Sequence, residues 1–65
     1  MKVVHEGRGG YIEIDDVRYP IEHIADGRFN IHFSRNKRDP RRDAHLRELD
    51  ALVATDPDRW TIEKR

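Results

Sequence analysis

The fold of this chain is decided between residues 11 and 33, which read YIEIDDVRYPIEHIADGRFNIHF. Apolar residues in this stretch recur at every second position, which is the period of a half-buried β-strand. Two pairs of turn-forming residues, Asp15-Asp16 and Asp26-Gly27, interrupt the alternation. The stretch therefore predicts an antiparallel meander with strands at about 11–15, 17–24 and 28–33.

The first hairpin has one register that satisfies every position. A two-residue loop at Asp15-Asp16 brings apolar residues together on one face and opposite charges together on the other. The cross-strand pairs that this loop predicts are Ile14 with Val17, Ile12 with Tyr19, and Glu13 with Arg18.

The second hairpin cannot be regular along its whole length. Strict pairing back from Asp26-Gly27 would place the carboxylate of Glu22 opposite Ile31, on the apolar face. An extra residue at Glu22 or His23, forming a β-bulge, restores the pairing of Ile21 with Ile31. We therefore expect an irregularity in this strand.

The chain after residue 38 predicts one helix. Asp39-Pro40 is a typical helix start, and Asp56-Pro57 is a typical stop, so the helix is expected at about 40–54. Its inward stripe, at 100° per residue, comprises Arg42, His45, Leu46, Leu49, Leu52 and Val53. Adding a strand at about 2–6 and an extended tail at 58–65 gives one small α+β domain over residues 1–65. Its architecture is an antiparallel three- or four-stranded meander sheet packed by one C-terminal helix.

Composition limits the class of protein. The chain has 65 residues, no cysteine and a net charge of zero, although 40% of its residues are charged. A chain this short buries only about 60% of its unfolded surface, so association as a homodimer is one way to add stability. We expect a soluble, cytoplasmic protein without a signal peptide or membrane contact.

The strongest functional signal is a basic cluster. Residues 34–47 hold six of the thirteen basic residues of the chain. A helix start flanked by arginines is suited to phosphate groups, because arginine forms planar, bidentate contacts with them. The leading hypothesis is a non-enzymatic interaction module that binds a nucleic acid or a nucleoprotein. The predicted contact residues are Arg35, Lys37, Arg38, Arg41 and Arg42.

Two other functions stay open. The first is a protein-binding regulator or inhibitor of the phage or mobile-element type, whose acidic strand region binds a basic protein surface. Its contact residues would be Glu13, Asp15, Asp16, Glu22 and Asp26. The second is a small metal-free ribonuclease that uses a carboxylate or imidazole base with arginines on the phosphate. Its residues would be Glu22, His23, Arg28, His32 and Arg35.

The histidines do not predict a metal site. His5, His23, His32 and His45 show none of the spacings that bring three or four ligands together, and there is no cysteine to help. The outward face of the sheet, with Arg18, Arg28, Asn30 and His32, could in principle reach bases, but the acidic residues on the same side would repel phosphate. We expect neither a metal nor a cofactor.

Overall fold

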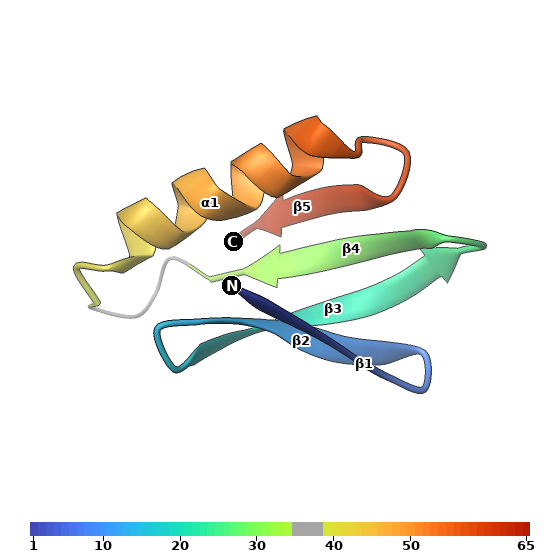
Figure 1. The fold of residues 1–65 in the computed structure, drawn as a ribbon, viewed down its shortest axis with the longest axis horizontal. Helices are drawn as coiled ribbons and strands as arrows, with labels where there is room; N and C mark the ends of the chain where they lie inside the picture. The colour runs from blue at the N-terminus through green and yellow to red at the C-terminus, as the bar shows by residue number, and fades with distance from the viewer. Residues whose placement is uncertain (35–38) are drawn as a thin grey trace.

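Five strands and one helix make up the fold (Figure 1). The computed structural model describes residues 1–34 and 39–65. The elements are, in chain order, β1 (Lys2–Glu6), β2 (Gly9–Ile14), β3 (Val17–Ala25), β4 (Arg28–Phe33), α1 (Arg42–Thr55) and β5 (Trp60–Lys64). The strands form one sheet in the order β1-β2-β3-β4-β5. The class is α+β, as expected.

The sheet is mixed and not purely antiparallel, so the expected three- or four-stranded meander is wrong in strand number and in the last pairing. β5, expected as an extended tail, pairs parallel to β4, with Trp60 opposite Phe29 and Ile62 opposite Ile31. Parallel neighbours need a crossover connection, and α1 supplies it by running back along the sheet between β4 and β5 (Figure 1). The last two strands and the helix therefore form a β-α-β unit joined to an antiparallel meander.

The hairpin of β2 and β3 has the predicted register. Ile14 pairs with Val17, and both central turn residues, Asp15 and Asp16, have positive φ angles of 51° and 65°. These angles are those of a type I′ turn, in which asparagine or glycine is more usual. On the outer face, the predicted pair of Glu13 and Arg18 forms an ion pair of 3.2 Å.

The bulge in β3 exists, but it lies one or two residues further along than expected. Ile21 pairs with Ile31 as predicted, and His23 pairs with Phe29. The register then shifts between His23 and Ala25, which leaves Ile24 as the extra residue, 49% exposed. The shift at Ile24 keeps Glu22 on the outer face, which is the requirement from which the bulge was inferred.

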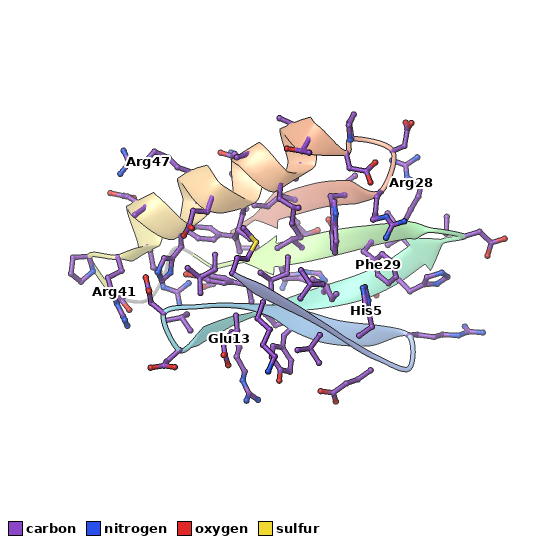
Figure 2. All side chains as sticks on the ribbon, in the orientation of Figure 1. His5, Glu13, Arg28, Phe29, Arg41 and Arg47 are labelled. Atoms are coloured by element: carbon purple, nitrogen blue, oxygen red, sulfur yellow. The ribbon has the colours of Figure 1, made fainter. Side chains whose placement is uncertain are left out.

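β3 is shared between the two halves of the sheet. Its first half, up to Pro20, pairs with β2, and its second half, from Ile21, pairs with β4. The sheet curls so strongly that His5 on β1 lies beside Phe29 on β4, with ring centroids 4.9 Å apart, and 6.5 Å from the ring of Trp60 on β5 (Figure 2). The two edge strands therefore approach each other at this end of the molecule.

The helix packs its predicted stripe against the concave face. His45 and Leu49 are buried, and Leu46, Leu52 and Val53 are partly buried against the core. The regular helix begins at Arg42, two residues after the expected start, because Asp39–Arg42 forms a separate turn closed by the Arg42 N–H and the Asp39 carbonyl (3.0 Å). The buried apolar side chains of the core are Ile12, Ile14, Tyr19, Ile21, Ile31, Phe33, Leu49 and Trp60.

Candidate functional site

The start of α1 and the β2–β3 turn lie against each other, and Arg41 joins them. The guanidinium of Arg41 pairs with the Asp39 carboxylate at 2.8 Å and donates to the carbonyl of Asp15 at 3.0 Å. The Asp39 carboxylate also accepts the backbone N–H of Arg41 at 2.9 Å. The hydrogen bonds from the Arg41 side chain and backbone lower the pKa of Asp39 to about 2. Both charges are thus already engaged within the protein.

Arg42 packs against the core of the domain. Its guanidinium carbon lies 5.4 Å from the ring centroid of Tyr19 and 5.8 Å from that of Phe33, at distances typical of cation–π contacts. Its Nη1 donates to the carbonyl of Ser34 at 2.6 Å. Its Nε is buried and has no hydrogen-bond partner among the described residues. Arg42 therefore holds the end of β4 against the start of the helix.

Three hydrogen-bonded side chains, two of them buried, link the helix to the same turn. His45 is 1% exposed. Its Nδ1 lies 2.6 Å from the Tyr19 hydroxyl, and its Nε2 lies 3.0 Å from the Asp15 carboxylate. Burial raises the pKa of the Tyr19 phenol, so the hydroxyl keeps its proton and can donate it to Nδ1. A neutral imidazole with its proton on Nε2 satisfies both bonds. Tyr19 and His45 are each 1% exposed, whereas the Asp15 side chain is 64% exposed, so these hydrogen bonds connect the core to a turn at the surface.

A shallow pocket of about 430 Å³ opens beside this junction. Two carboxylates and two guanidinium groups lie around it, so its formal charge is zero. One of the guanidinium groups, that of Arg42, is already bonded to Ser34. The lining residues are Asp16, Val17, Arg18, Asp39 and Arg42. By itself the pocket is not a phosphate site.

The predicted basic cluster divides into two groups. Arg35, Lys37 and Arg38 lie outside the described residues. Arg41 and Arg42 are described, and both make the internal contacts given above. To bind a partner with their full hydrogen-bonding capacity, these two arginines would have to release the turn or the carbonyl that they hold.

The predicted acidic residues are not gathered into one patch. Asp15 and Asp16 form the β2–β3 turn, while Asp26 lies in the β3–β4 turn, at the opposite end of β3. Glu13 is paired with Arg18, and Glu22 lies 3.2 Å from His32. A basic protein surface that bound all five residues would have to extend along the whole of β3 and would meet two carboxylates that already have partners.

His32 lies between two carboxylates on the outer face of the sheet. Its Nε2 is 3.2 Å from Glu22 and its Nδ1 is 3.2 Å from Glu63, which also binds Arg65. The hydrogen bond and charge of Arg65 lower the pKa of Glu63. The alternation of the strands places Glu22 and His32 on one face, but Glu63 joins them only through the parallel pairing of β5, which the sequence did not reveal.

The residues predicted for a ribonuclease are separated by the fold. Glu22 and His32 come together, whereas His23 faces the other side of the sheet and packs edge-on against Phe29, with centroids 5.4 Å apart. Arg28 begins β4 near the β3–β4 turn, and Arg35 lies outside the described residues. Among the described residues, no group of three histidine or acidic side chains is arranged to hold a metal ion.

No family model, curated relative or solved structure matches this chain. In the part of the chain that the structure describes, no helix is long and apolar enough to cross a membrane.

Proposed function

We propose that this protein is a non-enzymatic interaction module that binds a nucleic acid or a nucleoprotein through Arg35, Lys37 and Arg38. One observation carries the proposal: the chain is fixed on both sides of these three cations. Arg42 holds the carbonyl of Ser34 at 2.6 Å, and Arg41 holds the carboxylate of Asp39 at 2.8 Å. Arg41 and Arg42 are then positioning residues, and the other three cations are the contact residues.

The charge balance at this end of the molecule supports the same assignment. Four cations, Arg18, Arg41, Arg42 and Arg47, are outnumbered by five carboxylates, Glu13, Asp15, Asp16, Asp39 and Asp43. Any excess positive charge therefore comes from Arg35, Lys37 and Arg38, which add +3 within four residues. A short cationic segment with fixed ends loses less conformational entropy on binding than a free tail would. Phosphate neutralisation is the contact that such a segment can make without base-specific geometry.

Asp39, which follows the basic segment, is connected to the folded core through Arg41. Arg41 donates a hydrogen bond to the Asp15 carbonyl in the β2–β3 turn. The carboxylate of Asp15 is hydrogen-bonded at 3.0 Å to His45 of the helix. These contacts link three elements of the core to the residues that follow the basic segment. We therefore expect binding to be sensitive to the fold and not only to the number of cations.

The test compares two variants with the same change in net charge. Lys37→Glu with Arg38→Glu reverses two proposed contact residues. Arg8→Glu with Arg28→Glu reverses two exposed cations at the opposite end of the molecule, where Figure 2 shows Arg28 far from Arg41. Binding to fluorescent random-sequence duplex DNA and RNA is measured by anisotropy at ~50 mM salt.

We expect a large loss of nucleic-acid affinity for Lys37→Glu with Arg38→Glu. We expect a small loss for Arg8→Glu with Arg28→Glu. Replacing two cations that contact phosphate by carboxylates that repel it should weaken binding by roughly 100-fold or more. Charges far from the nucleic acid act on it only through a field that salt screens. Circular dichroism must show both variants folded. Equal losses in the two variants, or no binding by the parent chain at this salt concentration, would reject the proposal.

A further inference from the structure

β1 is an edge strand with an unpaired side. Among the described residues it pairs with β2 alone, and four of its five residues are exposed, including Val3 at 39%. An edge strand offers a row of free N–H and C=O groups to another strand, and natural proteins often protect such edges with lysine, proline or a β-bulge. β1 has no proline, and its lysine, Lys2, is matched by a residue of opposite charge, Glu6, at the other end of the strand.

The hairpin geometry shows which backbone groups face outward. Glu6 and Gly9 flank the two-residue turn at Gly7-Arg8, so they form a hydrogen-bonded pair. Hydrogen-bonded and non-hydrogen-bonded pairs alternate along an antiparallel ladder. The backbone N–H and C=O groups of Val3 and His5 therefore point away from β2, toward the free edge.

We propose that β1 pairs antiparallel with β1 of a second copy of this chain, about a two-fold axis at Val4. In this register Val3 of each copy lies opposite His5 of the other, so all four outward-facing residues hydrogen-bond across the axis. Lys2 of each copy lies opposite Glu6 of the other, on the same face as the two Val4 side chains. The sequence Lys-Val-Val-His-Glu is thus complementary to itself in charge when read antiparallel.

The other pairings available to this protein are less favourable. Centring the axis on Val3 keeps the hydrogen bonds but sets Lys2 against Val4, which removes both ion pairs. Pairing of β5 with itself about Ile62 would set Trp60 against Lys64, without charge complementarity. Pairing of β1 with β5 of a second copy would be heterologous and would leave free edges for further growth. The self-pairing of β1 closes with two subunits and joins two five-stranded sheets into one.

Charge-reversal variants test the register directly by sedimentation velocity, without any nucleic acid present. Lys2→Glu alone and Glu6→Lys alone each place like charges opposite each other twice, so each should weaken the dimer by ~10-fold or more. An equimolar mixture of the two variants should form a heterodimer as stable as the parent. In that heterodimer both carboxylates of one strand lie opposite ammonium groups of the other strand, so both ion pairs are restored. Loss in each variant with recovery in the mixture is the expected result.

A backbone variant tests the hydrogen bonds. Val3→Pro removes an N–H that faces the free edge and leaves the β1–β2 ladder intact, so it should give a folded monomer. A parent chain that stays monomeric up to ~1 mM overturns the proposal. So does a dimer that neither charge reversal weakens, because its interface must then lie elsewhere.

Discussion

At the scale of single residues, the hydrogen bond between Tyr19 and His45 fixes the helix on the sheet. Tyr19→Phe removes the hydroxyl 2.6 Å from Nδ1 of His45 and leaves a buried nitrogen without a partner. A buried unsatisfied polar group costs about 1–3 kcal/mol, which is a large part of the stability of a domain this small. Urea unfolding followed by circular dichroism should show a loss of this size.

Tyr11 provides the matched control for that substitution. Its ring lies on the outer face under the guanidinium of Arg18, 4.3 Å from the centroid. Tyr11→Phe keeps this contact, so its unfolding free energy should stay within about 0.5 kcal/mol of the parent. Equal effects of the two substitutions would show that the hydroxyl of Tyr19 has no special role.

Asp39 should make the stability of the protein depend on acid pH. Its pKa falls from 3.8 to about 2 because Arg41 donates hydrogen bonds from its side chain and backbone. A group whose pKa is lowered by folding stabilises the protein above its unfolded pKa, and this contribution is lost as the pH falls through the folded value. Asp39→Asn removes the charge but keeps an oxygen that can accept the Arg41 N–H.

The parent should therefore exceed Asp39→Asn in urea midpoint at pH 5–7, and the difference should vanish between about pH 4 and 2. A difference that stays constant over this range would mean that the Arg41–Asp39 pair does not stabilise the folded state.

The residue scale is also where reasoning from the sequence fell short. The basic cluster was visible in the sequence, but the division of its members was not. In the sequence, nothing distinguishes Arg41 and Arg42 from exposed arginines at a helix start. Their partners are distant in the sequence or belong to other elements: Asp15, Ser34 and the ring of Tyr19. The helical periodicity did place Arg42 in the inward stripe of the helix. That position was the sequence signal that indicated its contacts with the core.

At the scale of elements, the β2–β3 turn contains two aspartates with positive φ angles. The side chain of one of them forms a hydrogen bond within the protein, and that of the other does not. Asp16 has φ 65°, and no described residue forms a hydrogen bond or ion pair with its carboxylate, whereas Asp15 accepts a bond from His45. Glycine at such a position relieves roughly 1–2 kcal/mol of strain and costs about 0.5–1 kcal/mol of backbone entropy. Asp16→Gly should therefore raise the unfolding free energy by roughly 0.5 kcal/mol.

Asp15→Gly relieves the same kind of strain but removes the acceptor of the His45 Nε2 proton, so it should destabilise the protein. Thermal unfolding of the two variants side by side measures the difference. Stabilisation by both substitutions would mean that the bond between Asp15 and His45 contributes nothing.

The antiparallel hairpins could be predicted because local pairing follows from turn residues and alternation. The pairs of Ile14 with Val17 and Ile21 with Ile31 rest on contacts less than a dozen residues apart. The parallel pairing of β4 with β5 joins residues about thirty positions apart, and a short run such as Trp60–Ile62 does not identify its partner. The position of the bulge, at Ile24, was not predicted because one extra residue anywhere between Ile21 and the turn restores the pairing of Ile21 with Ile31.

At the scale of the whole molecule, the two proposals use different segments of the chain. The edge of β1 would join two copies, while the cations between Ser34 and Asp39 would contact the partner. A dimer would then present two cationic segments, and linked binding sites raise the overall affinity when both can engage at once. The charge reversals in β1 should therefore weaken binding to long nucleic acids more than binding to short ones.

The salt dependence of nucleic-acid binding tests the central claim most directly. We assume that Arg35, Lys37 and Arg38 each neutralise one phosphate of duplex DNA. A plot of the logarithm of the binding constant against the logarithm of the salt concentration should then have a slope of about −2.7 per subunit. Lys37→Glu with Arg38→Glu should reduce the slope to about −1 or abolish binding, while Arg8→Glu with Arg28→Glu should leave it near the parent value. A slope near zero for the parent chain, or a slope that the first pair of reversals does not change, would contradict the account.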